Sequence, residues 1–247
     1  MEPLVVALWS FAVAVAGGVA GLVLGNLRLP VLLQFAASPA AGAGANVAVS
    51  GLSALTASVA HWRAGRIEWR LFWLMAPPSL LGGIGGGLIS GLLPKRVLLA
   101  AIALVVLFGA YEISRRDRFA DAGERPGGGV LAALTIAFAV GVLGGLVGLI
   151  LGTLRLPAMV KWLGTSPKAA VGTNAAVGTI VGLGGLLGHL PSGVDWPLLW
   201  AGAAGAIPGA YLGAQLTGRL DDAALLRVIS AILVIAGLAL GVEAVVG

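Results

Sequence analysis

Long apolar segments fill most of this chain and constrain its fold more than any other feature. An apolar helix of about 20 residues can cross the hydrocarbon core of a bilayer. Hydrophobic residues make up 59% of the 247 residues and charged residues 10%, whereas a soluble domain carries about 25% charged residues. The sequence therefore predicts an all-α integral membrane protein. The long segments are 4–25, 39–60, 71–92, 96–113, 129–151, 167–189, 197–217 and 222–242.

Two homologous halves make up the chain. A shift of 127 residues places GGVAGLVLGNLRLP (17–30) on GGLVGLILGTLRLP (144–157). A shift of 128 residues places SPAAGAGANVAV (38–49) on SPKAAVGTNAAV (166–177). Internal repeats of this length are typical of transporter folds. The predicted organisation is a first membrane repeat at 1–113, a polar linker at 114–128 and a second membrane repeat at 129–247.

In each half a short apolar stretch, LRLPVLLQFA or LRLPAMVKWL, follows the first long segment, and it is too short to cross a bilayer. If all eight long segments cross once, the basic residues divide 7 to 8 between the two sides. If the first segment and the short stretch instead form a re-entrant hairpin, the basic residues outside the hairpins divide 11 to 2. The positive-inside rule favours the second topology.

The favoured fold is thus two homologous inverted repeats, each a re-entrant or broken helical hairpin plus three transmembrane helices, with both termini outside. The alternative of eight plain spans stays open, and in it Arg28 and Arg155 reach the lipid headgroups.

Arg28 and Arg155 are predicted at the tips of the two hairpins, inside the membrane. Glycines before them permit a broken helix, and Pro30 and Pro157 suit the first turn of a return helix. An arginine just ahead of a helix N-terminus favours anion binding. Two such tips, entering from opposite faces, predict an anion site near the midplane.

Polar residues of the next helix can complete this site. Asn46 and Asn174 follow the helix-start signals Ser38-Pro39 and Ser166-Pro167 by about two turns, which places them near the midplane. Thr173, and Asn26 and Thr153 at matched hairpin positions, are further candidate substrate-binding donors. In the alternative interpretation, the asparagines only hold helices together.

Several functions are disfavoured by what the sequence lacks. No acidic residue lies in the middle of an apolar segment, which argues against cation transport and a carboxylate proton relay. With no cysteine and two histidines, we expect no metal site and no cofactor, and no enzyme chemistry is indicated. The basic residues flank apolar segments, so they favour lipid headgroups as partners and not nucleic acid.

The repeated glycine-rich segment ending in LRLP, the SPxxAxGxN helix start, and the loop from His61 or His189 to IEW or VDW resemble the TauE/SafE sulfite-exporter-like permeases. The resemblance implies export of small sulfur oxyanions or organosulfonates, such as sulfite or thiosulfate, through a cell inner (cytoplasmic) membrane. Many members carry a longer glycine run where this chain has Leu24-Gly25-Asn26, which leaves the substrate undefined.

The predicted mechanism is alternating access, with a small anion and membrane lipids as partners and a homodimer left open. The alternatives are an ion-coupled anion importer and an intramembrane enzyme or scaffold. Both histidines are expected at helix ends near the membrane interface.

Overall fold

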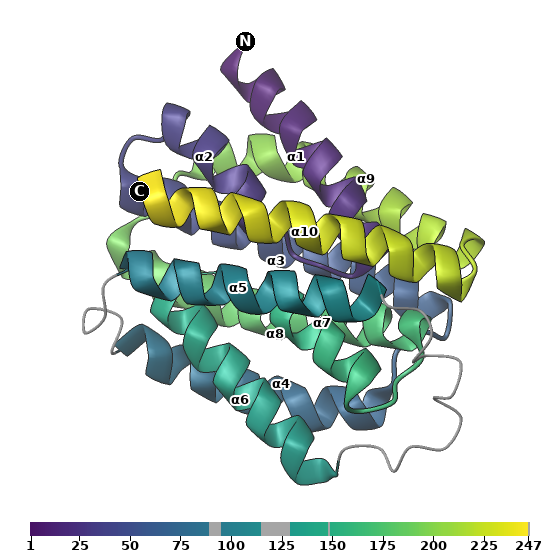
Figure 1. Cartoon of the computed structure of the whole chain (residues 1–247). Coiled ribbons are helices and arrows are strands. Elements are labelled where there is room, and N and C mark those ends of the chain that lie inside the picture. Colours follow the sequence, from purple (N-terminus) through teal and green to yellow (C-terminus); the bar gives the residue numbers. More distant parts are fainter. Residues whose placement is uncertain (89–94, 115–128, 148, 247) are drawn as a thin grey trace.

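The computed structural model describes residues 1–88, 95–114, 129–147 and 149–246, and every regular element in these ranges is a helix (Figure 1). The all-α prediction is confirmed, and the predicted linker lies, except for Ser114, outside the described residues. The first half contains α1 (Glu2–Ala20), α2 (Gly25–Phe35), α3 (Pro39–Arg63), α4 (Trp69–Leu88) and α5 (Lys95–Ser114). The second half contains α6 (Val130–Val147), α7 (Gly152–Lys161), α8 (Pro167–His189), a 3-10 turn (Leu190–Ser192), α9 (Trp196–Arg219) and α10 (Asp222–Val246).

Helix packing follows the repeat of the sequence. When α1 to α5 are matched with α6 to α10, the main contacts of one half have counterparts in the other. Helix α1 packs on α9 as α6 packs on α4, and α2 packs on α3 as α7 packs on α8. The matched helices α3 and α8 pack on each other, and so do α5 and α10.

Matched helices run in opposite directions. A methyl group at Gly44, early in α3, would lie 3.5 Å from His189 Cβ at the end of α8. A methyl group at Gly172, early in α8, would lie 3.1 Å from His61 Cβ near the end of α3. Ser230, early in α10, likewise donates to the carbonyl of Ala110, late in α5. The pairs α3 and α8, and α5 and α10, are therefore antiparallel.

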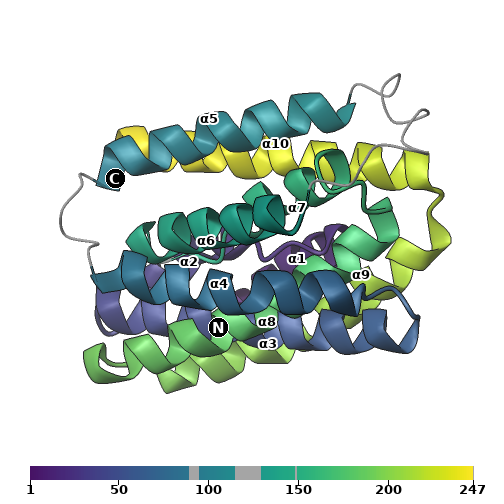
Figure 2. The same ribbon diagram turned by 90° about the horizontal axis from the view of Figure 1, so that it is seen from below.

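The short helices lie in the middle of the molecule. Figure 2 shows the α5 and α10 pair on one side, α3 and α8 with α4 and α9 on the other, and α2 and α7 between them. Contacts of α2 with α3 and α10, and of α7 with α8 and α5, agree with this view. Helices α1 and α6 cross the bundle obliquely (Figure 1).

Each half begins with a broken helical hairpin. Helix α1 ends at Ala20, the next residue Gly21 has a left-handed φ of 63°, and the N–H of Leu22 donates to Gly17 O at 2.8 Å. The indole Nε1 of Trp9 then donates to Leu27 O at 2.9 Å, so α2 folds back along α1. In the second half the N–H of Leu149 donates to Gly144 O at 3.0 Å, which repeats the first turn.

The short helices start earlier than the sequence indicated. We expected them to begin after the arginines, but α2 begins at Gly25 and α7 at Gly152, so each arginine is the fourth helical residue. Pro30 and Pro157 therefore lie inside the helices. The first four N–H groups of any helix have no partner within it, so a proline at the sixth position leaves only one further carbonyl unpaired.

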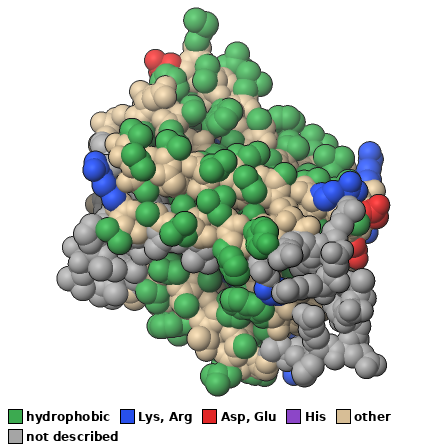
Figure 3. Space-filling view, in the orientation of Figure 1, with side chains coloured by type: hydrophobic (Ala, Val, Ile, Leu, Met, Phe, Trp, Pro, Cys, Tyr) green, Lys and Arg blue, Asp and Glu red, His purple; other side chains and the backbone are tan. Residues whose placement is uncertain are grey.

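The surface suits a lipid environment. Within the described residues, four helices are long and apolar enough to cross a membrane: Glu2–Ala20, Ala41–Arg63, Pro167–His189 and Asp222–Val246. Large apolar side chains such as Trp73, Leu104, Leu131 and Leu187 are exposed. Figure 3 shows apolar side chains over much of one face, with most of its Lys and Arg at one end. This distribution is that of an integral membrane protein.

Candidate anion-binding site

Arg28 and Arg155 are among the largest fully buried side chains of the described residues. They are 2% and 1% exposed, on α2 and α7. A buried cation is costly unless hydrogen bonds or an opposite charge compensate it. Across residues 1–88, 95–114, 129–147 and 149–246, every hydrogen bond of these two guanidinium groups goes to a neutral oxygen. Both sites therefore contain a positive charge without an anionic partner from the described chain.

Arg28 is bound tightly to α3. Its Nε donates to Asn46 Oδ1 at 3.1 Å, and its Nη2 donates to Asn46 O at 3.4 Å and to Ser50 Oγ at 2.5 Å. Asn46 Nδ2 in turn donates to Gly25 O at 3.1 Å. Asn46 and Ser50 are four residues apart, so they share one face of the helix. Most of the donors of this guanidinium group are thus used within the protein.

Arg155 is held more loosely. Its Nη1 donates to Ser79 Oγ at 3.5 Å, the limit of a hydrogen bond, and its buried Nε has no partner. Asn174 Nδ2 donates to Gly21 O at 2.7 Å and to Gly152 O at 3.2 Å, but Asn174 Oδ1 is also without a partner. The second half thus leaves one buried donor and one buried acceptor unpaired.

The two hairpins meet next to the crossing of α3 and α8. Val23 and Ile150, at matched positions in the two breaks, form a small apolar cluster with Ala54. A pocket beside them brings together Asn26 and Thr153. Asn26 Nδ2 donates to Ala236 O of α10 at 3.3 Å. Two predicted donors, one from each half, therefore line one pocket.

A second cavity adjoins Arg28. Glycines of α1 and residues of α3 and α9 line it, and it includes Ser53, whose buried Oγ has no partner. His61 lies two turns further along α3 and is fully buried. Sequence reasoning missed Ser53. It expected His61 at a helix end, where the residue lies, but it did not predict that His61 is fully buried. The signal was the spacing of Asn46, Ser50, Ser53 and His61, which places them along one face of a helix.

Thr173 faces a different neighbour. Its Oγ1 accepts a hydrogen bond from the N–H of Glu68 at 2.9 Å, in the loop between α3 and α4. Arg66 of the same loop donates from Nη1 to Ala214 O of α9 at 2.9 Å. The structure therefore brings Asn174 to the hairpin and Thr173 to the loop.

An all-helical bundle with an apolar surface, an internal repeat and buried arginines beside two broken helices has the architecture of a multi-pass membrane transporter. The family model described as "Sulfite exporter TauE/SafE" matches residues 6–240. The chain belongs to this family, and the resemblance seen in its motifs is confirmed.

Three curated relatives from Bacillus subtilis (strain 168) are each named "Probable membrane transporter protein". YjnA is 27% identical over 241 residues, covering 90% of this chain and 93% of the relative. YdhB is 24% identical over 205 residues, covering 80% and 82%. YunE is 33% identical over 105 residues, covering 42% of this chain and 38% of the relative, so this match spans less than half of either.

No solved structure matches the chain. Family and relatives together identify a membrane transporter and not an enzyme.

Proposed function

We propose that the protein is a permease that exports small sulfur-containing oxyanions, such as sulfite, thiosulfate or organosulfonates, through the cell inner membrane. The observation that carries this proposal is the matched pair of buried arginines, which lack a carboxylate partner within the described residues. An anion from solution would supply the missing charge. The description of the family supports a sulfur oxyanion as its chemical class.

The proposed site extends over both halves. Arg155 and Asn174 contribute one part, and Arg28 and Asn46 the matched part. Asn26 and Thr153, which line the pocket between the hairpins, are neutral donors for the substrate. Thr173 accepts from Glu68, and its hydroxyl hydrogen remains available to donate.

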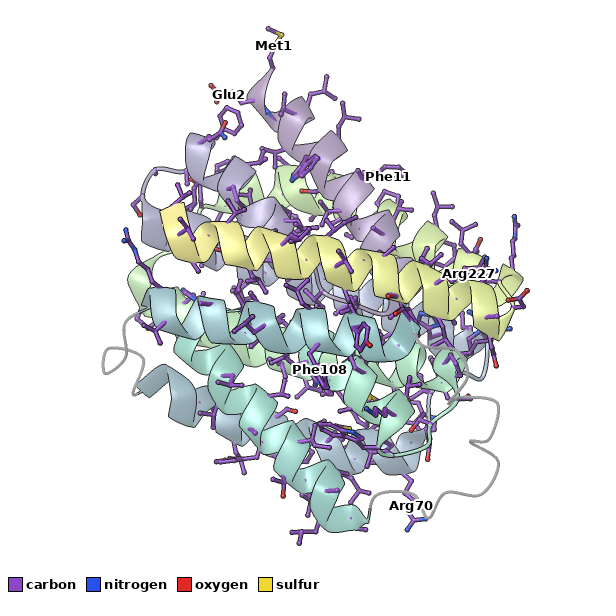
Figure 4. All side chains as sticks on the ribbon, viewed as in Figure 1. Met1, Glu2, Phe11, Arg70, Phe108 and Arg227 are labelled. Atoms are coloured by element: carbon purple, nitrogen blue, oxygen red, sulfur yellow. The ribbon has the colours of Figure 1, made fainter. Side chains whose placement is uncertain are left out.

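Inverted repeats fit the antiparallel course of the matched helices. Contacts between Arg66 and Ala214, and between Lys168 and Asp222 at 4.0 Å, join segments at one end of the bundle. In Figure 4, Arg70 and Arg227 lie toward this same end. Its basic residues are Arg63, Arg66, Arg70, Lys161, Lys168, Arg219 and Arg227. By the positive-inside rule this end is cytoplasmic.

Transport proceeds by alternating access in this proposal. The anion binds between the hairpins, and one repeat rocks against the other to open the site to either side. A membrane potential that is negative inside favours anion exit by about 2.3 kcal/mol per charge per 100 mV. Export of an anion therefore needs no coupled ion.

Flux into everted membrane vesicles tests the proposal. We expect saturable uptake of labelled sulfite or a labelled sulfonate by vesicles containing the wild-type protein. Arg155→Ala should reduce uptake about tenfold or more, because a charged hydrogen bond contributes about 1.5 to 3 kcal/mol. Arg227→Ala, at an exposed arginine, is the matched control and should leave uptake unchanged. Absence of saturable anion uptake in the wild type would overturn the proposed function.

A further inference from the structure

The two matched arginine and asparagine pairs differ in the hydrogen bonds between their members. Arg28 Nε donates to Asn46 Oδ1 at 3.1 Å, which closes the first pair. In the second pair, Arg155 Nε and Asn174 Oδ1 are both buried and both without a partner. Arg155 is 1% exposed and Asn174 is 2% exposed. Unpaired buried donors and acceptors are unfavourable, so these two atoms favour the binding of a polar group between them.

The chemical character of the two open positions is fixed. Asn174 Nδ2 donates to the carbonyls of Gly21 and Gly152, so the opposite atom of the amide must be the oxygen, which only accepts. A guanidinium Nε–H only donates. The open pair therefore offers one charged donor and one neutral acceptor.

The difference between the halves originates in the sequence. Ser50 binds Arg28 Nη2 in the first half, and the matched position in the second half is Gly178, which has no hydroxyl. Ser79 substitutes only weakly, because its Oγ is 3.5 Å from Arg155 Nη1, at the limit of a hydrogen bond. Within the described residues Arg155 thus keeps an unpaired Nε, whereas Arg28 Nε is bound to α3.

We propose that Arg155 and Asn174 select a monoanion that carries a hydrogen-bond donor beside its oxyanion group. This inference rests on the proposed function and narrows its substrate class. An oxyanion oxygen accepts from Arg155 Nε, while a hydroxyl or amino group of the same ligand donates to Asn174 Oδ1. The acid form of a small sulfur oxyanion has both groups, and so has a short hydroxysulfonate. A fully deprotonated dianion presents only lone pairs, which Asn174 Oδ1 repels.

Two probes of equal charge and nearly equal shape test this inference. Hydroxymethanesulfonate carries a hydroxyl where ethanesulfonate carries a methyl group. Calorimetric titration of the purified full-length protein should give about tenfold tighter binding of hydroxymethanesulfonate, the value of one hydrogen bond to a buried acceptor. Asn174→Ala should abolish this preference. The matched variant Asn46→Ala should keep it, because Asn46 Oδ1 is occupied by Arg28.

The outcomes separate the inference from the proposed function. Equal affinity of the two sulfonates for the wild type, with binding still lost in Arg155→Ala, overturns the inference alone; a water molecule then bridges the open pair. Loss of the preference in Asn46→Ala but not in Asn174→Ala also overturns it. Failure of the wild type to bind sulfite and either sulfonate overturns both. The wild-type comparison is decisive even if a variant does not fold.

Discussion

Within the described part of the chain, Arg28 donates three hydrogen bonds to α3, whereas Arg155 donates one long bond to Ser79. We therefore expect Arg28→Ala to lower stability more and Arg155→Ala to lower anion affinity more. Losing Arg28 leaves Asn46 Oδ1 unpaired, at a cost of about 1 to 3 kcal/mol. Thermal unfolding with and without sulfite measures both effects, because a bound anion raises the melting temperature. This assignment would be contradicted if Arg155→Ala lowered stability more and Arg28→Ala lowered anion affinity more.

Gly178 is a position at which a substitution can change the hydrogen bonding of Arg155 while Arg155 itself stays unchanged. A Cβ there would lie 3.3 Å from Val23 Cγ2 and 3.6 Å from Ala54 Cβ, so a small side chain fits after a slight shift. Gly178→Ser restores the hydroxyl that Ser50 supplies to Arg28. We expect anion affinity to fall about tenfold, because one donor of Arg155 becomes occupied. Gly178→Ala is the control for bulk alone; an equal loss of affinity in both variants would refute the role of the hydroxyl.

The break between α1 and α2 depends on Gly21. Its φ is 63°, and a methyl group there would overlap the carbonyl oxygen of Val171 on α8. Gly164 has a similar φ of 65°, but a methyl group there would meet nothing within 4 Å. Gly164→Ala should therefore lower the free energy of unfolding by only about 1 to 2 kcal/mol, because Gly164 has a left-handed backbone conformation. Gly21→Ala should lower the free energy of unfolding by more than this, which a larger fall in melting temperature would show. Equal falls would mean that the contact with α8 does not constrain the hairpin.

Helix limits could be predicted best where the sequence carries a local signal. Pro167–His189 matches the predicted segment in full, because Ser166-Pro167 marks its start. The starts of α2 and α7 were misplaced because a proline early in a helix is compatible with several registers. The repeat also predicted equal roles for Arg28 and Arg155. Ser50 and the matched Gly178 are visible in the sequence, but only the structure shows that Ser50 binds Arg28.

Segments far apart in the chain meet at opposite ends of the whole bundle. Arg66 contacts α9 at one end, and at the other the N–H of Ala37 donates to Asp195 Oδ2 at 3.1 Å. We predict that Ala64 and Gly193, in the loops at these two ends, face opposite sides of the membrane. The chain has no cysteine, so Ala64→Cys and Gly193→Cys each introduce a single thiol.

An impermeant maleimide should label Gly193→Cys in intact cells, and it should label Ala64→Cys only after permeabilisation. Labelling of both from the same side would reject the inverted repeats and favour eight plain spans. Labelling with the two sides exchanged would reverse the orientation.

At the crossing of α3 and α8, a methyl group on Gly182 would lie 2.6 Å from Gly51 Cα, so the two helices touch backbone to backbone. Such a crossing acts as a pivot, because a rotation there displaces the touching atoms least. The end of α3 at Arg63 is twelve residues from Gly51, a lever arm of about 18 Å along a helix. A tilt of about 10° moves that end by about 3 Å, roughly the width of one oxygen atom. In the proposed alternating-access cycle, Gly51 and Gly182 serve as this pivot, and a small tilt about them opens the site at one end of the bundle.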